Sequence, residues 1–133
     1  MKKLLFAALV FCSINVFAQK KADDVAKFNI ESFDFGKVEQ NKPATATFVV
    51  KNIGTEPLII DQAAPSCGCT VSDYTKSPIA PGKTGTIKAT FNAASMGPID
   101  KTVTVKLAGI DDVKFLKLKG EVVAPTATVA KKK

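Results

Sequence analysis

The amino-acid sequence predicts an all-β protein, an immunoglobulin-like β-sandwich of seven or eight strands from about Lys27 to Val123. Three observations support this prediction. Hydrophobic side chains recur with a period of two in several short segments, turn-forming residues separate those segments, and the chain is long enough for one domain with a core of its own.

The first strand region changes phase. Phe28 and Ile30 occupy even positions, whereas Phe33 and Phe35 occupy odd positions. Successive side chains leave opposite faces of a strand, so one extra residue moves every later side chain to the other face. We therefore expect a β-bulge or a bend here, and we expect this first strand to cross from one sheet to the other.

Three further segments alternate cleanly, with apolar side chains on one face and polar side chains on the other; they are residues 45–51, 86–91 and 102–107. A strand with one buried and one solvated face shows this pattern. Residues 58–60, Leu-Ile-Ile, are a continuous apolar run, which predicts a strand that is covered on both faces.

The last strand region again changes phase, because Val113 and Phe115 give way to Leu116 and Leu118. We expect a second bulge or bend at this point. Turns are predicted at residues 52–54, 81–83 and 109–112, where Gly, Pro, Asn and Asp gather. The adjacent pair Asp111 and Asp112 is assigned to such a turn rather than to a metal or acid–base site.

The first 18 residues have the pattern of an export signal. Lys2 and Lys3 precede an apolar run, and Val16-Phe17-Ala18 places cleavage after Ala18. The run is too short to span a bilayer, so we expect no integral membrane segment after cleavage. Lipoprotein processing at Cys12 is an alternative, but Phe11 stands where that processing needs a small residue. The mature protein is thus expected in the periplasm or secreted.

The two ends of the mature chain have a different composition from its middle. Residues 19–26 are polar and charged and are predicted to be a flexible lead-in, which makes residues 27–124 the folded domain. Residues 125–133 are rich in Ala and Thr and end in three lysines, so we expect a disordered tail.

The composition excludes several classes of function. The formal net charge is +7, but every basic residue is Lys, and the chain has no Arg and no His. Nucleic-acid binding would normally use Arg for bidentate contacts, so we expect no nucleic-acid partner. Without His, neither a Ser-His-Asp nor a Cys-His arrangement can form, and no phosphate-binding loop occurs. We therefore expect no enzymatic activity, no catalytic residue and no cofactor.

Cys67 and Cys69 are the two cysteines that would remain after cleavage, and they form a C-x-C sequence with Gly68 between them. Three alternatives follow for this candidate disulfide or thiol site. The pair forms a local disulfide or two packed thiols, it shares a Cu(I) ion with a second chain, or it exchanges electrons. Gly68 allows the turn that a disulfide over so short a distance needs.

Other residues stand out for structural reasons. Phe33, Phe35, Phe48 and Phe91 are expected to fill the core. Gly36 allows a backbone conformation that other residues resist. Asn52, Gly54, Pro81 and Gly82 are expected to form turns. Thr70 is a further structural motif residue, directly after the cysteines.

Five motifs follow one another along the chain: F-x-F-G-x-V at residues 33–38, residues 48–54 with Pro57-Leu58, C-G-C-T at residues 67–70, P-G-K at residues 81–83, and residues 118–122. In this order they resemble a bacterial family of secreted immunoglobulin-like domains known as domain of unknown function 1573. The family is similar in turn to ASPM, SPD-2 and hydin-type domains and to major-sperm-protein-like sandwiches. The resemblance implies a sandwich exported by a Gram-negative bacterium of the Bacteroidota kind, and it implies no particular activity.

Two functions are therefore expected from the sequence. The first is an exported, non-catalytic interaction or structural module of the cell envelope, whose partner is an unidentified protein or glycan. The alternative is a periplasmic thiol site on Cys67 and Cys69 that binds Cu(I) or takes part in redox exchange.

Overall fold

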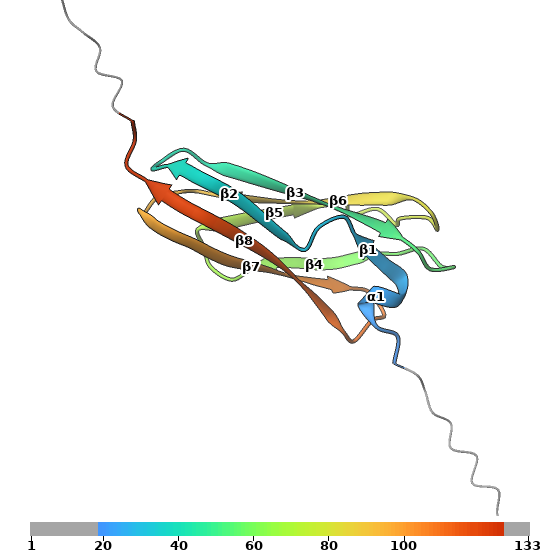
Figure 1. Ribbon diagram of the computed structural model, residues 1–133. Coiled ribbons are helices and arrows are strands. Elements are labelled where there is room, and N and C mark those ends of the chain that lie inside the picture. Colours follow the sequence, from blue (N-terminus) through green and yellow to red (C-terminus); the bar gives the residue numbers. More distant parts are fainter. Residues whose placement is uncertain (1–18, 127–133) are drawn as a thin grey trace, which may run out of the picture.

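The computed structural model describes residues 19–126, which form one short helix and eight strands (Figure 1). The elements are α1 (Ala22–Val25), β1 (Ala26–Phe28), β2 (Ser32–Glu39), β3 (Ala44–Asn52), β4 (Ile60–Pro65), β5 (Thr70–Tyr74), β6 (Thr84–Phe91), β7 (Gly97–Leu107) and β8 (Val113–Val123).

The strands form two four-stranded sheets that pack face to face. One sheet has the order β1-β3-β6-β5, and the other has the order β2-β8-β7-β4. All strand pairs are antiparallel except β2 and β8, which run parallel. The predicted immunoglobulin-like β-sandwich is thereby confirmed.

The core lies between the sheets and consists of the alternating residues that the sequence indicated. The side chains predicted to face inward in residues 45–51, 86–91 and 102–107 are all buried: Ala46, Phe48, Val50, Ile87, Ala89, Phe91, Val103, Val105 and Leu107. Leu116 and Leu118 of β8 are fully buried beside them. These burial patterns confirm the period-two interpretation of the three segments.

The phase change in the first strand region has a simple cause. Phe28 ends β1, which pairs with β3 in one sheet, and Ser32 begins β2, which pairs with β8 in the other. The expected crossing between sheets is therefore present, but it divides the region into two strands. A register irregularity also occurs within β2, between Asp34 and Lys37.

Two other sequence-based expectations are wrong. The β7–β8 register runs without interruption past residues 113–118, and Phe115 is 54 % exposed on the outer face. The apparent phase change there comes from a surface aromatic residue and not from a bulge. Residues 58–60 are not covered on both faces either, because Ile59 is exposed between the buried side chains of Leu58 and Ile60.

The four phenylalanines expected in the core are buried to different degrees. Phe48 and Phe91 are buried. Phe33 and Phe35 are only partly buried, because β2 is an edge strand, and their rings contact each other edge to face with centroids 5.0 Å apart.

The folded domain begins earlier than expected. Residues 22–25, which we assigned to a flexible lead-in, form the helical turn α1, and β1 starts at Ala26. Ala22 and Ala26 are both buried against the core, which accounts for the ordered start. The predicted signal peptide, residues 1–18, lies outside the described residues, as does the predicted tail from residue 127 onward.

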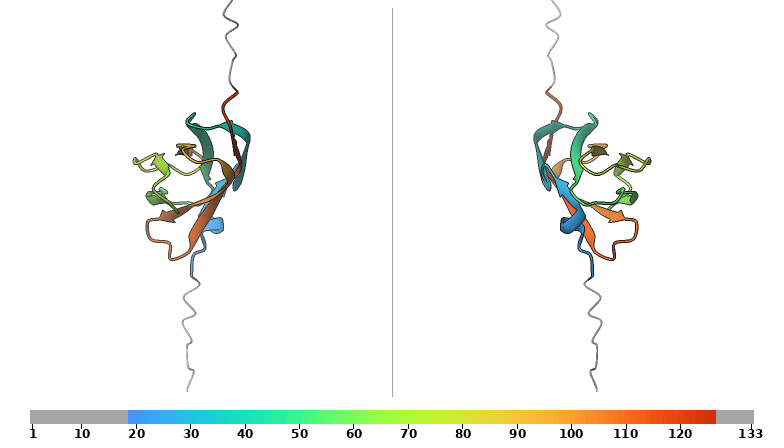
Figure 2. Two further views of the ribbon diagram at one scale, coloured as in Figure 1. Left: turned by 90° about the vertical axis from the view of Figure 1, so that its left-hand side faces the viewer. Right: turned by 90° about the vertical axis from the view of Figure 1, so that its right-hand side faces the viewer.

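The described chain enters and leaves the sandwich at opposite ends (Figures 1 and 2). The helix α1 lies at one end, beside the turn that joins β7 to β8. The C-terminus of β8 and the start of β7 lie at the other end, because Gly97 pairs with Val122. The loop between β4 and β5, which carries the cysteines, belongs to this second end.

Candidate functional site

The C-x-C sequence lies where the chain passes from one sheet to the other. Strand β4 ends at Pro65 in one sheet, and β5 begins at Thr70 in the other. Between them Cys67 and Cys69 are joined by a disulfide, with their Cα atoms 5.3 Å apart. That separation lies within the range of ordinary disulfides. Both cysteines are half-buried, and Gly68 is exposed at the tip.

Hydrogen bonds hold both sides of this loop. The Ser66 N–H donates to the carbonyl oxygen of Thr102 (2.8 Å), and the Thr102 N–H donates to Ser66 Oγ (3.1 Å). On the other side the Asn92 N–H donates to the carbonyl oxygen of Cys69 (2.9 Å). The loop is thus attached to β7 and to the end of β6, as well as being closed by the disulfide.

The turn within the loop does not depend on glycine. The Thr70 N–H donates to the carbonyl oxygen of Cys67 (3.3 Å) across the turn. The backbone of Gly68 is not left-handed, and a Cβ atom placed there would meet no atom within 4 Å. The freedom of glycine, which we invoked from the sequence, is therefore not required at this position.

Thr70 follows the disulfide and points into the sandwich opposite Phe91. It is one of two polar residues among the buried side chains, and its hydroxyl has no hydrogen-bond partner among the described residues. The sequence motif C-G-C-T therefore ends in an inward-facing hydroxyl beside the core.

A groove of about 220 Å³ adjoins the disulfide. It is lined by Cys69, Phe91, Asn92, Ala94, Ser95, Met96, Gly97, Pro98 and Lys101. Met96 is 60 % exposed although it is strongly hydrophobic, and Lys101 is the single charged residue of the lining. Sequence reasoning missed this groove, because its residues come from the β4–β5 loop, the end of β6, the loop after β6 and the start of β7.

The remaining motif residues lie elsewhere. Asn52, Gly54, Pro81 and Gly82 gather at the opposite end of the sandwich, where β3 ends at Asn52. Asn52 is buried, and its side-chain amide donates to the carbonyl oxygens of Glu56 (2.7 Å) and Ile79 (2.8 Å). Its Oδ1 accepts the Gly54 N–H (2.9 Å), and its carbonyl accepts the Gly82 N–H (2.9 Å). These residues therefore organise two loops.

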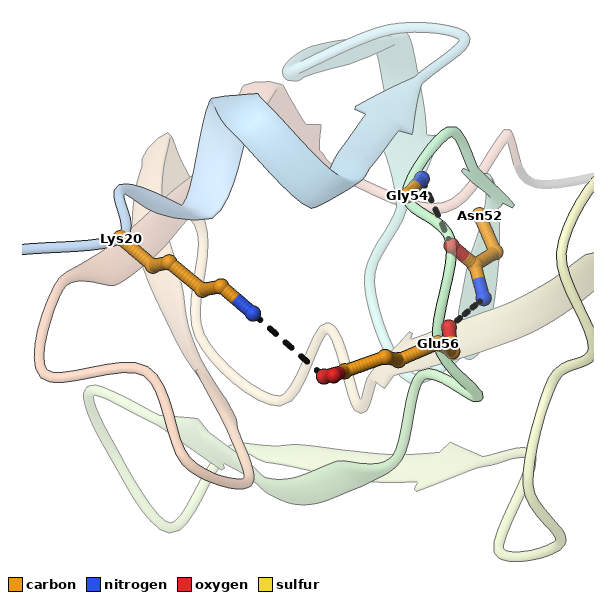
Figure 3. A network of polar contacts seen from close by, with 4 residues as sticks. All are labelled: Lys20, Asn52, Gly54 and Glu56. Atoms are coloured by element: carbon orange, nitrogen blue, oxygen red, sulfur yellow. Dashed lines mark hydrogen bonds and ion pairs between the residues drawn. The ribbon is translucent and has the colours of Figure 1, made fainter.

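A larger hollow of about 400 Å³ lies at that same end, between the loop after β3 and the β7–β8 turn. Lys20 reaches across it to the carboxylate of Glu56, 3.4 Å away (Figure 3). The ion pair between Lys20 and Glu56 therefore already spans part of this hollow.

Phe33, Phe35 and Gly36 form a third group on the edge strand β2. Gly36 has a left-handed backbone (φ 65°), as the sequence suggested, and its N–H donates to Asp34 Oδ1 (2.7 Å). The carbonyl oxygen of Gly36 would lie only 2.8 Å from a Cβ atom at Gly120. This close approach of two backbones explains glycine at position 120, which sequence reasoning did not single out.

Lys114 is a further residue that sequence reasoning missed. Its side chain is 12 % exposed, and its ammonium group contacts Asp23 Oδ1 (2.6 Å) and Glu31 Oε1 (2.5 Å). Burial lowers the pKa of Lys114, but the hydrogen bonds to Asp23 and Glu31 outweigh burial and raise that pKa above its ordinary value. Lys114 thus attaches α1 and the β1–β2 connection to β8.

Within residues 19–126 no cluster of three or more His, Cys, Asp or Glu side chains is placed to hold a metal ion. Asp112, of the acidic pair in the predicted turn, accepts the Ala22 N–H at 3.3 Å. No helix in that same range is long and apolar enough to cross a membrane.

Comparison with solved structures supports the same fold. A protein of unknown function from Porphyromonas gingivalis W83 aligns with a TM-score of 0.63 and 16 % identity over 74 % of this chain. The PapD-like domain 7 of human CEP192, an ASH domain, aligns with a TM-score of 0.62 and 12 % identity over 92 % of this chain and 99 % of that domain. The secreted serine protease VesC of Vibrio cholerae aligns at 0.58 and 11 % over 75 % of this chain.

The chain spans 46 % of the Porphyromonas protein and 24 % of VesC. No curated protein sequence is significantly similar to it. The model of the family described as protein of unknown function, DUF1573, matches residues 26–122, which include both sheets and the C-G-C-T motif. The chain therefore belongs to the DUF1573 family.

Proposed function

We propose that this protein is an exported, non-catalytic interaction module of the bacterial cell envelope. One observation carries the proposal: the end of the sandwich that bears the disulfide presents a groove with an exposed methionine and a loop held by several hydrogen bonds. Exposed apolar side chains around a concave, pre-formed surface are typical of binding sites. The partner is a protein or glycan of the envelope.

Export is the second part of the proposal, and it rests on the N-terminal sequence. Lys2 and Lys3, the apolar run and Ala18 are the features that support a signal peptide and a periplasmic or secreted location. Fractionation of cells that express the full chain tests this. Recovery of the mature protein with the cytoplasm would overturn it.

The competing proposal is a thiol site for Cu(I) or redox exchange on Cys67 and Cys69. Cu(I) binding requires thiolates, so the disulfide must first be reduced. With no His in the chain, Cys67 and Cys69 of one molecule supply only two ligands to the ion. An interaction module, by contrast, binds its partner through its surface and does not require the cysteine sulfurs to act as metal ligands.

One experiment separates the two proposals. The tagged domain, as wild type and with Cys67→Ser and Cys69→Ser together, is used to recover partners from envelope extract, with excess untagged domain as competitor. We expect the Ser variant to retain a partner that the competitor displaces. We also expect the reduced wild type to bind Cu(I) no more tightly than a generic dithiol peptide. Tight stoichiometric copper binding that the Ser variant loses would overturn the interaction proposal, as would the absence of any competed partner.

A further inference from the structure

Strand β7 is longer than the strand beside it, and this leaves part of its edge uncovered. It runs from Gly97 to Leu107, but its pairing with β4 ends where Pro65 lies opposite Val103. The last contact on that side is the pair of hydrogen bonds between Ser66 and Thr102. The chain then turns away through the C-x-C loop. Residues 97–101 therefore have β8 on one side, and no strand from residues 19–126 pairs with them on the other.

The direction of the free backbone groups follows from strand geometry. In an antiparallel ladder, alternate residues direct their N–H and C=O groups to opposite neighbours. The backbone of Thr102 faces β4, so the backbones of Asp100 and Pro98 face the same side. The Asp100 N–H, the Asp100 C=O and the Pro98 C=O therefore lie along the uncovered edge. An extended peptide could pair with these three groups.

The groove runs beside this edge, and its chemistry restricts the peptide. Lys101 belongs to the inward series of β7, and the apolar side chains of that series, Ile99, Val103, Val105 and Leu107, are all buried. Lys101 instead lines the groove and has no ion-pair partner among residues 19–126. The side chain of Asp100 leaves the other face of β7, because it is adjacent to Lys101. The groove thus combines one cation with the apolar surfaces of Phe91 and Met96.

We propose that the uncovered edge of β7 at Pro98–Asp100 binds an extended acidic peptide of a partner protein as an added β-strand. The peptide continues the line of β4, places an acidic side chain beside Lys101 and places apolar side chains against Met96 and Phe91. This inference rests on the proposed interaction function, and it names the partner as a protein segment rather than a glycan.

The other sheet edges are less suited to this role. β1 has only three residues, and β2 is irregular between Asp34 and Lys37. The side chains of Ser72 and Tyr74 already donate to carbonyl oxygens of β4, at Ala63 and Asp61. Short, irregular or covered edges resist strand addition. The chain's own residues 127–133 end in three lysines, and like charge beside Lys101 disfavours them as the occupant.

The test uses the mature protein with its disulfide intact and a capped peptide, Thr-Val-Thr-Glu-Thr-Val-Thr, whose Val and Glu side chains share one face. Matched peptides carry Gln or Lys in place of Glu. Titration is followed by amide shifts and by hydrogen exchange. We expect the largest shifts around the groove, and we expect exchange of the Asp100 amide to slow at least tenfold at saturation, because that N–H gains an acceptor.

Two variants probe the groove itself. Lys101→Gln should weaken binding of the Glu peptide about fivefold and leave the Gln peptide unaffected, as for a partly solvated ion pair. Lys106→Gln is the control, since Lys106 lies on β7 but is exposed outside the groove. Met96→Asp should weaken binding of the Glu peptide at least tenfold by adding like charge and removing apolar contact. Val71→Asp, at a residue that is 69 % exposed and outside the groove, should have no effect.

Several results would overturn the inference: no preference for Glu over Lys, shifts centred on another edge, or an unprotected Asp100 amide at saturation. So would faster exchange of that amide after deletion of residues 127–133, or self-association through this edge. A native partner that is still recovered by Met96→Asp contradicts the peptide site but not the interaction function. A wild-type domain that recovers no competed partner contradicts the function itself.

Discussion

The side-chain amide of Asn52 donates a 2.8 Å hydrogen bond to the carbonyl oxygen of Ile79, which lies 27 residues further along the chain. Its second amide hydrogen binds the carbonyl of Glu56, and its Oδ1 accepts the Gly54 N–H. Asn52 is 1 % exposed, so water cannot replace these bonds readily. One buried side chain thus joins the end of β3 to the loop that follows β3 and to the loop that precedes β6.

Asn52→Leu should lower the free energy of unfolding by about 3 kcal/mol, because it leaves the buried carbonyl oxygen of Ile79 without a donor and also removes the bonds to Glu56 and Gly54. Denaturant unfolding of the two proteins measures the loss. Asn29→Ala is the control: its Oδ1 accepts the Val49 N–H at an exposed site, and its loss should cost about 1 kcal/mol or less. Equal losses in both variants would show that burial of the Asn52 network does not matter.

Phe48→Ala should cost about 3–5 kcal/mol, because Phe48 is fully buried between the sheets and its removal leaves a cavity. Replacement of both Cys67 and Cys69 by Ser should cost about 1 kcal/mol or less, since the disulfide closes a very short loop. Phe115→Ala, at an exposed aromatic residue, serves as the control for Phe48. If the Ser variant did not fold while Phe48→Ala had no effect on stability, the assignment of Phe48 to the core and of the disulfide to a minor role in stability would be wrong.

Gly120→Ala should destabilise the protein by about 2 kcal/mol or more. The backbone there has φ 146°, and the new Cβ would lie 2.8 Å from the carbonyl oxygen of Gly36. Gly68→Ala should change the free energy of unfolding by less than about 0.5 kcal/mol, because the position is open and not left-handed. Thermal unfolding of both variants checks the contrast. A larger effect at Gly68 would mean that the C-x-C turn does require glycine.

Lys114 makes part of the stability dependent on pH at the alkaline end. Its pKa is raised in the folded protein, so its contribution is fully present below the unfolded pKa of about 10.4 and is lost as pH rises through the higher folded value. The free energy of unfolding should therefore fall above about pH 10.4. In Lys114→Met that part of the decrease should be absent, whereas Lys106→Met should behave as wild type. Identical profiles for wild type and Lys114→Met would contradict the role of the Asp23 and Glu31 contacts.

Export should end in cleavage after Ala18 without attachment of lipid, because Phe11 precedes Cys12 where a small residue would be needed. The intact mass of the protein recovered from the cell envelope measures this. The expected species begins at Gln19. A species that begins at Cys12 with added acyl mass would show lipoprotein processing instead.

The sequence by itself was sufficient for the fold class and for most of the core. The alternation of Ala46, Phe48 and Val50 predicts an inward face, because side chains on a strand must leave opposite sides of the pleat. The same rule gave a wrong prediction at Phe115, which is exposed. The pattern shows which residues are apolar, but it does not show which face of a strand another sheet covers. Gly36 was recognised from its own position, whereas Gly120 was not, because its constraint comes from a neighbouring strand.

Tertiary structure alone decided the candidate site. The cysteines were visible in the sequence, but the groove beside them joins Cys69 to Met96 and Lys101, residues 27 and 32 positions away. In the sequence Lys101 precedes the alternating segment 102–107, and nothing there distinguishes it from an ordinary surface lysine. It lines the groove because β4 ends at Pro65 and leaves the start of β7 uncovered. The point at which β4 stops pairing with β7 depends on how the two sheets pack, and the local sequence does not show it.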